Sequence, residues 1–342
     1  MIKVLIINDS ITIQEHMKRI INADSGCKLI GVASDGFEGF DLVNSMCPDV
    51  ILMDIHMPRC DGMQATAKIM KFRPTPLIIV TATITKHMSR IYDCMANGAL
   101  EVVKTPVTVD EGHNLINRIK IANSLKPRVV KTEKIALADG DRSFKSRVGT
   151  SLKTSAARKI IAIGASTGGP NAVVTVLKDL PPDLNAAVII VQHIGAEFAP
   201  SLADWLDTNC RLRVKPAQDD ERIINGTGLL AGRNENLVVE RGYTVKYREA
   251  PPSAICVPSI DVTFKSIAEI YGPHAIGVIL TGMGTDGAMG LKAIRDAGGR
   301  TIAQDEESSL IYGMPKAAAQ LGAAEFILPS NKIAGQIMKL LQ

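Results

Sequence analysis

The feature that most constrains the fold of this chain is an alternation of short apolar runs with amphipathic segments, which occurs twice. Within residues 1–121 the apolar runs are KVLII, KLIGV, VILM, LIIV and EVV. Between them stand helix-like segments such as SITIQEHMKRIINA and GFEGFDLVNSM. Parallel strands need helical crossovers, so this rhythm predicts a doubly wound, parallel-sheet α/β domain over residues 1–121.

The same alternation returns from residue 160 to the end of the chain. IIAIG, AAVIIVQ, AIGVILTG and RTIAQ are strand-like, and GLKAIRDAG and MPKAAAQL are helix-like. The middle of this half, GLLAGRNENLVVERGYTVKYREAPP, consists instead of short β-type runs separated by Gly and Asn, which is typical of hairpins. Residues 160–342 are therefore predicted to form a second doubly wound parallel-sheet domain with an inserted antiparallel β ribbon.

Residues 122–159 break the rhythm and carry most of the positive charge. They contain ten Lys and Arg against three Asp and Glu, a surplus of +7, whereas the whole chain has a formal charge of +4. Scattered charges, Ser and Thr with little periodicity favour a flexible, solvent-exposed basic linker between the two domains.

The composition is that of an ordinary soluble protein, with 46% apolar and 22% charged residues in 342. No run approaches the roughly 18 apolar residues of a membrane span, and the first strand begins almost at Met1, which leaves no room for a signal peptide. We therefore expect a cytoplasmic protein without membrane insertion. The cysteines form no CxxC pair and no obvious metal cluster, so we interpret them as isolated thiols: Cys27, Cys47, Cys60, Cys94, Cys210 and Cys256.

Polar residues follow the predicted strands of the first half, at the edge of the sheet where α/β proteins bind ligands. They are Asn8 and Asp9 after the first strand, Asp54 after the third, Thr81 and Ala82 after the fourth, and Lys104, Thr105 and Pro106 after the fifth. Aspartates, a hydroxyl and a lysine gathered at one edge could hold Mg²⁺ and accept a phosphoryl group on a carboxylate. The alternative is that these residues are only helix caps and turn formers.

This constellation resembles the receiver domain of two-component response regulators over essentially all of residues 1–121. The motif MDIHMPRCDG at 53–62 carries the resemblance. The resemblance implies that Asp54 accepts the phosphoryl group, that Mg²⁺ binds to Asp9, Asp54 and the backbone carbonyl of His56, and that Thr81 and Lys104 act as switch residues.

Two departures from the receiver pattern bear on the metal and on phosphorylation. The family has two acidic residues where this chain has Asn8 and Asp9, so one charged metal ligand is lost. The family's lysine directly precedes the proline, whereas here Thr105 stands between Lys104 and Pro106. We expect weaker binding of Mg²⁺ than is usual for a receiver.

The loop GASTGGP, at 164–170, opens the second domain and admits two interpretations. A phosphate-binding P-loop would need a lysine followed by a hydroxyl residue, and a dinucleotide fingerprint would need glycine where Ser166 stands. The residues do match G-x-S-x-G, with Ser166 on a turn between a strand and a helix and the backbone N–H of Thr167 nearby for an oxyanion. Glycine-rich turns also occur for steric reasons alone.

A serine nucleophile needs an imidazole as base and a carboxylate to orient it. His193 stands at the carboxyl end of a predicted strand, whereas His274 precedes a strand and falls at the wrong edge. Asp286, in the glycine-rich loop of VILTGMGTDGAMG, is the acid candidate and Asp305 its competitor. Asp286 could instead be a simple helix N-cap.

The order Ser, His, Asp differs from the α/β-hydrolases, whose acid precedes the histidine. With GASTGGP, VQHI (191–194), the PPS near 251–253 and TGMGTDGA (281–288), the chain resembles the CheB-type chemotaxis protein-glutamate methylesterases. The resemblance implies a catalytic triad of Ser166, His193 and Asp286 in this methylesterase domain, with the backbone N–H of Met283 as a further oxyanion donor.

The resemblance also implies what such a protein does. The substrates are glutamyl methyl esters on the cytoplasmic domains of chemoreceptors, many members also deamidate receptor glutamines, and the reaction passes through an acyl-enzyme without a metal or organic cofactor. A chemotaxis histidine kinase supplies the phosphoryl group, and the phosphorylated receiver domain relieves its block of the esterase cleft.

Two other classes of function are less compatible with the sequence. A response regulator that binds DNA or a partner without catalysis would need a basic recognition helix, and residues 160–342 show none. No binding of nucleic acid is therefore expected. A small-molecule α/β esterase would need an acid before His193 in the chain, and the sequence lacks it there.

Overall fold

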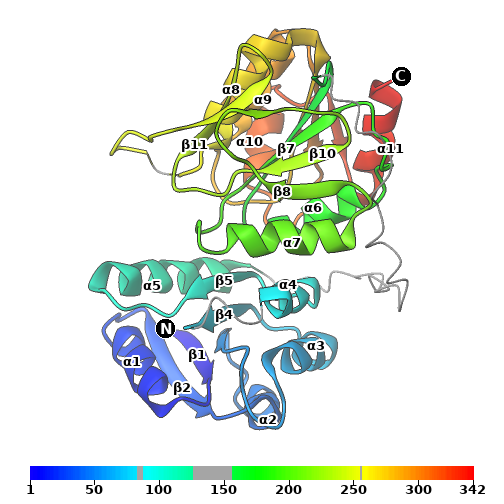
Figure 1. Cartoon of the computed structure of the whole chain (residues 1–342). Helices are drawn as coiled ribbons and strands as arrows, with labels where there is room; N and C mark the ends of the chain where they lie inside the picture. The colour runs from blue at the N-terminus through cyan, green and yellow to red at the C-terminus, as the bar shows by residue number, and fades with distance from the viewer. Residues whose placement is uncertain (83–87, 126–155, 255) are drawn as a thin grey trace. The chain divides into compact units, whose positions relative to one another are not determined.

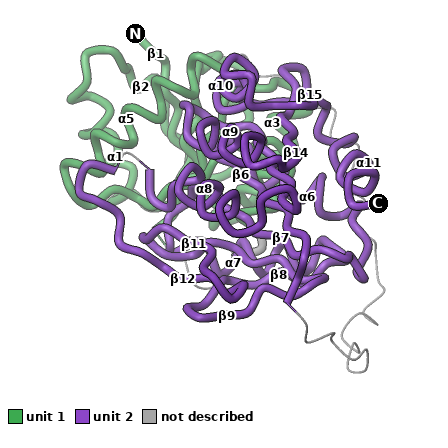
Figure 2. The backbone as a smooth tube through the Cα atoms, turned by 90° about the horizontal axis from the view of Figure 1, so that it is seen from above, with its two compact units in different colours: residues 1–133 green, residues 134–342 purple. Residues whose placement is uncertain are grey.

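The computed structural model describes residues 1–82, 88–125, 156–254 and 256–342. The chain divides into two compact units, residues 1–133 and 134–342, which are described separately here (Figure 2). The linker expected at 122–159 falls mostly outside the described residues, and the boundaries at 121 and 160 stay predictions.

Unit 1 contains a five-stranded parallel sheet in the order β2-β1-β3-β4-β5. Its strands are β1 (Ile2–Ile7), β2 (Cys27–Ala33), β3 (Val50–Met53), β4 (Leu77–Thr81) and β5 (Glu101–Lys104). Its helices are α1 (Ile11–Asn22), α2 (Gly36–Met46), α3 (Gly62–Phe72), α4 (Met88–Ala96) and α5 (Val109–Ser124). One strand alternates with one helix throughout, as the sequence predicts.

The elements of unit 1 follow from local chemistry. All residues of β3 and β4 are buried, as continuous apolar strands covered on both faces require. Helix α2 begins where the Asp35 side chain accepts hydrogen bonds from the N–H groups of Phe37 and Glu38. Helix α5 begins with a capping box made by Thr108 and Glu111.

Unit 2 contains a seven-stranded parallel sheet in the order β15-β14-β13-β6-β7-β10-β8. Its strands are β6 (Ile160–Ala165), β7 (Ala187–Gln192), β8 (Arg213–Pro216), β10 (Thr227–Leu230), β13 (Ala275–Ile279), β14 (Arg300–Gln304) and β15 (Phe326–Leu328). A small antiparallel sheet, β11-β12-β9, is formed by β9 (Glu221–Arg222), β11 (Asn236–Glu240) and β12 (Thr244–Arg248). The predicted class, a doubly wound parallel sheet with an antiparallel insertion, is confirmed.

One part of the predicted ribbon belongs to the main sheet. The run GLL at the start of the expected ribbon forms most of β10, which pairs in parallel with β7 and β8. A short apolar run does not reveal whether its partners are local or distant, and here the neighbours of β10 come from earlier in the chain. The hairpin itself is β11 with β12, from Asn236 paired with Arg248 to Glu240 paired with Thr244.

Among the described residues of unit 2, six α-helices cover the faces of this sheet. They are α6 (Gly169–Leu177), α7 (Ala199–Asn209), α8 (Ile260–Tyr271), α9 (Ala288–Asp296), α10 (Met314–Gln320) and α11 (Ser330–Leu340). Helices α8, α9 and α10 lie on one face, and α6, α7 and α11 lie on the other (Figure 1). No helix among the described residues is long and apolar enough to cross a membrane.

Strand β6 has β13 on one side and β7 on the other, so the carboxyl ends of three strands meet near the middle of the sheet. Every residue of β6 and β7 is buried. Ile260 and Phe264 of α8 are fully buried in the core that covers this region. The loops that leave these strands therefore start from the buried core of unit 2.

Candidate active site

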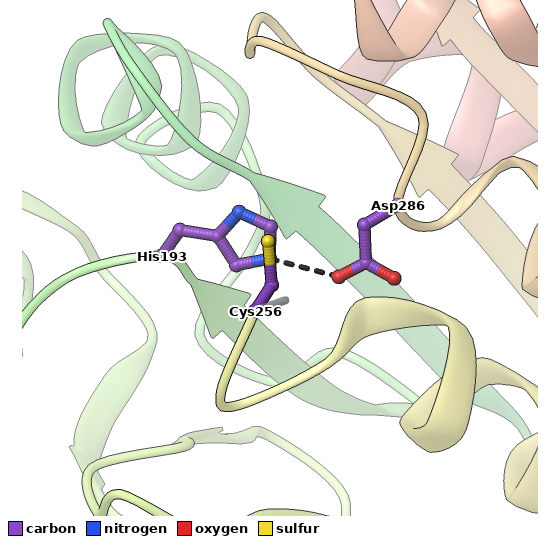
Figure 3. A group of neighbouring side chains, drawn as sticks. All are labelled: His193, Cys256 and Asp286. Carbon is purple, nitrogen blue, oxygen red and sulfur yellow. Dashed lines mark hydrogen bonds and ion pairs between the residues drawn. The ribbon is translucent and has the colours of Figure 1, made fainter. Parts of the chain in front are cut away.

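His193 and Asp286 form a hydrogen-bonded pair at this edge of the unit 2 sheet. The Nε2 atom of His193 lies 2.9 Å from Oδ2 of Asp286 (Figure 3). The two residues come from different elements, since His193 follows β7 and Asp286 lies in the loop between β13 and α9. Each side chain is 14% exposed, so the pair is largely shielded from water and still open on one side.

The Asp286 carboxylate is fixed by the start of α8. Oδ1 accepts hydrogen bonds from the Ser259 hydroxyl and the Asp261 N–H, both at 3.0 Å. Oδ2 accepts one from the Ile260 N–H at 2.8 Å in addition to its bond with His193. Hydrogen-bond donors at a helix N-terminus, where the helix dipole is positive, suit an anion. Asp286 is therefore held in one orientation by the chain itself.

These contacts set the charge state of the carboxyl. Burial by itself raises the pKa of Asp286, but the hydrogen bonds from His193, Asp261 and Ile260 outweigh burial, and the pKa lies below the ordinary value. Asp286 is thus ionised at neutral pH. An ionised carboxylate on Nε2 holds the proton of the imidazole there and leaves Nδ1 as the nitrogen that can accept another.

Ser166 lies one residue beyond the end of β6, next to His193. The last paired residues of β6 and β7 are Ala165 and Gln192, and Ser166 and His193 each come directly after them. The N–H of His193 donates to the carbonyl of Ala165 at 3.0 Å, which extends the pairing by one step. Neighbouring strands lie about 4.8 Å apart, so the main chain brings the two residues to adjacent positions.

The turn that carries Ser166 depends on glycine at two positions. Gly168 has φ +76°, in the left-handed region that favours glycine, and it caps α6. Gly282, in the loop after β13, approaches so closely that a Cβ there would lie 2.7 Å from Cβ of Ser166. Ser166 also donates its N–H to the carbonyl of Thr281 at 3.0 Å. The serine is thus wedged between the ends of β7 and β13.

Two backbone donors flank the serine. Within the described part of the chain, the N–H groups of Thr167 and Met283 donate to no other protein group. Thr167 directly follows Ser166, and Met283 directly follows Gly282, whose backbone contacts the serine. Unused N–H groups at such a position are the kind of donor that stabilises a developing oxyanion.

The structure shows where the alternative candidates from the sequence lie. Asp305 accepts hydrogen bonds from the N–H and hydroxyl of Ser308, and so closes a local turn. His274 is exposed in a 3₁₀ helix (Gly272–His274) before β13, at the opposite edge of the sheet. The N-cap of α9 is Gly287, so Asp286 does not have the capping role that its position also allowed.

Two residues near this pair are not predicted from the sequence. Ser259 is the N-cap of α8, where its hydroxyl accepts from the Val262 N–H and donates to Asp286. A serine that follows proline and precedes a helical pattern is a detectable N-cap signal, although its contact with Asp286 is not. The Cys256 thiol lies beside the pair, and burial followed by the charge of Asp286 raises its pKa. A thiol kept protonated is a poor rival nucleophile.

In unit 1, Asp54 lies at the carboxyl end of β3 and is 8% exposed. Its Oδ1 accepts from the Ile55 N–H at 2.7 Å, and its Oδ2 accepts from the Asn8 amide at 3.2 Å. Burial raises the pKa of Asp54, and the nearby charge of Asp9 adds to this, while the Ile55 and His56 N–H groups act in the opposite direction. On balance the pKa of Asp54 lies above its ordinary value, so the surroundings disfavour the ionised form of this carboxyl.

The other predicted site residues of unit 1 differ in how far they are buried. Thr81 is buried at the end of β4, and Asp9 is exposed beside the site. Lys104 is paired with Thr81 across β4 and β5, but its side chain is exposed. Thr105 is the buried residue at the end of β5, and its hydroxyl has no hydrogen-bond partner among the residues that the structure describes.

The donor chemistry around Asp54 fits a hard cation. The carboxylates of Asp9 and Asp54 and the backbone carbonyl of His56 would supply oxygen ligands, the type that Mg²⁺ prefers. Asn8 offers an amide where a further carboxylate would have added a second negative charge.

The comparison with known proteins agrees with this geometry. Residues 4–117 match the family model of the response regulator receiver domain, and residues 161–337 match that of the CheB methylesterase. The catalytic domain of the CheB methylesterase from Thermotoga maritima is 35% identical, with a TM-score of 0.52, and the match covers 53% of this chain and 98% of that one.

Curated relatives match along nearly the full length. The protein-glutamate methylesterase/protein-glutamine glutaminase 1 of Cupriavidus pinatubonensis is 42% identical over 98% of this chain and 97% of its own. The corresponding protein 2 of Burkholderia orbicola is 41% identical over 98% of both chains. This chain therefore belongs to the protein-glutamate methylesterase/protein-glutamine glutaminase family of carboxylic-ester hydrolases, with a response regulator receiver domain preceding a CheB methylesterase domain.

Proposed function

We propose that this protein hydrolyses glutamyl methyl esters on the cytoplasmic signalling regions of chemoreceptors, with Ser166 as the nucleophile. The observation that carries the proposal is the His193–Asp286 pair, one strand away from Ser166 and joined to it by the register of β6 and β7. The relatives named above supply the class of ester.

The first half of the reaction forms an acyl-enzyme. The Ser166 oxygen attacks the ester carbonyl while Nδ1 of His193 takes the serine proton, and Asp286 stabilises the imidazolium through Nε2. When the tetrahedral intermediate collapses, the bond to the methoxy group breaks and His193 returns the proton to it. Methanol leaves, and the glutamyl group remains on Ser166.

The second half returns the enzyme to its starting state. His193 takes a proton from water, the resulting hydroxide attacks the acyl-enzyme, and the bond to Ser166 breaks as the serine regains its proton. The product is the free glutamate side chain. In both halves negative charge develops on the former carbonyl oxygen, and the unused N–H groups of Thr167 and Met283 are the proposed donors to it.

The same groups could remove ammonia from a glutamine side chain, because an amide differs from an ester here only in its leaving group. The curated relatives carry both activities in their names. The amine leaves poorly without a proton, so His193 would have to act as general acid in that reaction. We propose glutaminase activity as a second use of the same triad.

For unit 1 we propose regulation by phosphorylation of Asp54, with a chemotaxis histidine kinase as phosphodonor. Asp9, Asp54 and the His56 carbonyl would hold Mg²⁺, which would neutralise charge on the transferred phosphoryl group. Thr81, buried at the end of β4, is the proposed hydroxyl that responds to the phosphate. Its neighbour in the register, Lys104, is the proposed cationic switch residue. These partners and substrates are consistent with a cytoplasmic location.

The test is the release of methanol from methylated receptor by the parent protein and by a Ser166→Ala variant. We expect the rate to fall by roughly 10⁴- to 10⁶-fold, as when the nucleophile of a serine triad is removed. The matched control is Ser330→Ala, at the start of α11, whose hydroxyl donates no hydrogen bond within the described residues. Equal rates from the parent and from Ser166→Ala would show that Ser166 is not the nucleophile.

A further inference from the structure

Three side chains with metal-binding chemistry meet at the His193–Asp286 pair. A ring nitrogen of His193, Sγ of Cys256 and a carboxylate oxygen of Asp286 all lie within 4.8 Å of one another. Figure 3 shows the thiol of Cys256 next to the imidazole ring, on the side of the bond to Asp286. The three residues come from the end of β7, the loop before α8 and the loop before α9.

The donor set is the one that zinc prefers. Imidazole nitrogen, thiolate sulfur and carboxylate oxygen are its usual protein ligands, at about 2.0–2.3 Å from the metal. In a tetrahedral site those bonds separate the ligand atoms by about 3.4–3.6 Å. The hydrogen-bonded atoms of His193 and Asp286 at 2.9 Å would have to move apart by a fraction of an ångström, and the sulfur lies within reach.

We propose that Cys256, His193 and Asp286 form an inhibitory site for a zinc-class divalent ion. The inhibition rests on the proposed esterase function, whereas the binding of the ion does not. Three protein ligands leave a fourth position for water, and none of the three residues is fully buried, so an ion could enter from solvent.

The surroundings of the site support metal binding. Ser259, Ile260 and Asp261 already hold both oxygens of Asp286 by hydrogen bonds, which is the kind of outer contact that orients a metal ligand. The charges also balance, because one thiolate and one carboxylate neutralise a divalent cation. The Cys256 thiol must release its proton to solvent when the ion binds.

Binding of the ion would prevent His193 from acting as the general base. A neutral imidazole that ligates a metal through Nε2 carries its proton on Nδ1. That proton occupies the nitrogen which would otherwise accept the proton of Ser166. Asp286 would at the same time exchange its bond to His193 for a bond to the ion. The esterase is then inactive without any change in fold, and removal of the ion restores it.

The ligand set also separates this ion from the Mg²⁺ of the receiver domain. Thiolate and imidazole are softer ligands than the oxygens that Mg²⁺ selects. Millimolar Mg²⁺ should therefore leave the esterase rate unchanged, whereas zinc should reduce it.

Binding is tested on the full-length protein with Co²⁺ as a spectroscopic substitute for zinc. Coordination of the thiolate gives a sulfur-to-cobalt charge-transfer absorption in the near ultraviolet, which we expect in the parent and not in Cys256→Ala. The control is Cys210→Ala, a partly exposed thiol of the same unit at the end of α7. Cys256→Ser, which keeps the size of the side chain, should lose the absorption as well.

Inhibition is tested by methanol release over a range of zinc concentrations, each variant being compared with its own metal-free rate. Loss of the thiol should raise the concentration for half-inhibition by at least tenfold, since even outer contacts of metal ligands are worth about 10- to 100-fold in affinity. Cys210→Ala should behave as the parent does, and a chelator should restore the rate.

Two results would overturn the site: cobalt absorption that survives in both Cys256 variants, or zinc inhibition that is equal in the parent and in both variants. A parent protein that binds cobalt through Cys256 but releases no methanol would instead contradict the proposed function and leave the metal site standing.

Discussion

At the scale of single residues, the proposed tasks of the two ring nitrogens of His193 are exchanged relative to chymotrypsin-type serine proteases. Those enzymes use Nδ1 towards the carboxylate and Nε2 towards the nucleophile. Here Nε2 is bonded to Asp286, which leaves Nδ1 for the proton of the proposed nucleophile. The proposed triad thus combines the same three chemical groups with the imidazole ring turned around.

The orientation of that ring gives a prediction for Asp286→Asn. An amide in place of the carboxylate can donate to Nε2 and so favours the tautomer with the proton on Nδ1, which cannot act as base. We expect methanol release to fall by about 10⁴-fold, the loss seen for the same change in a serine protease. Asp305→Asn is the matched control, because Asp305 directly follows β14 and its carboxylate accepts hydrogen bonds from Ser308 in its own turn. A similar rate for the two variants would contradict the role of Asp286.

Asp54 gives a prediction about stability and pH. A carboxyl whose pKa is raised by folding binds its proton more tightly in the folded state. Between the unfolded pKa, about 3.9, and the folded pKa, the free energy of unfolding therefore decreases as the pH rises. Asp54→Asn removes this penalty, so the variant should be more stable than the parent at neutral pH, and the difference should vanish near pH 4.

The free energy of unfolding is measured with denaturant on the full chain without Mg²⁺, once at neutral pH and once near pH 4. Asp41→Asn, an exposed aspartate on α2 of the same unit, should show no such dependence on pH. A difference between Asp54→Asn and the parent that is equally large at both pH values would show that protonation of Asp54 is not its cause.

At the scale of elements, the N-terminus of α8 is the support of the candidate site. Ser259 both caps the helix and donates to Asp286. Ser259→Ala should lower the free energy of unfolding by about 0.5–2 kcal/mol, the usual cost of a lost N-cap. It should also raise the pKa of Asp286, because a hydrogen bond to the charged form is lost.

The pH profile separates these two effects. In Ser259→Ala the acid limb of methanol release should move to higher pH, which a loss of stability alone would not cause. Ser266→Ala is the control, since Ser266 lies on the same helix and bonds to the backbone of Val239 and Thr263 away from the site. Unchanged acid limbs in both variants would contradict the role of Ser259.

The elements differed in how far the sequence could predict them. Runs such as VILM of β3 and LIIV of β4 are short, wholly apolar and bounded by polar residues, so their type was clear. Strand β8 has the sequence RVKP, with one buried residue, and it exists because β10 offers it a partner. A strand of that kind has too little local signal to be predicted.

The same distinction applies to the site. The ends of β6, β7 and β13 could be predicted, and with them the neighbourhood of Ser166, His193 and Asp286. The contacts of Ser259 and Cys256 depend on how the segment before α8 folds over the sheet, which no local pattern encodes. Lys104 shows the reverse case: its position next to Thr81 follows from the register, but the exposure of its side chain does not.

At the scale of the whole molecule, a receiver domain and an esterase domain in one chain predict that phosphorylation changes the esterase rate. Acetyl phosphate with Mg²⁺ should raise methanol release by the parent and not by Asp54→Asn. A change of about 5- to 150-fold would be typical of coupling between two sites. Asp41→Asn serves again as the control and should respond as the parent does.

Two outcomes would contradict this coupling. If Asp54→Asn responded as strongly as the parent, Asp54 would not be the phosphoacceptor. If the parent did not respond at all, the amide of Asn8 and the buried Thr105 would be the residues to change first, because each occupies a place where receivers carry a charge.

The register of β6 and β7 also determines how the site behaves in time. Main-chain hydrogen bonds in the centre of a buried sheet open only when the whole domain unfolds, whereas surface loops fluctuate within nanoseconds to microseconds. The spacing between Ser166 and His193 is set by such bonds. The backbones of Ser166 and His193 are therefore expected to keep this spacing for as long as unit 2 stays folded.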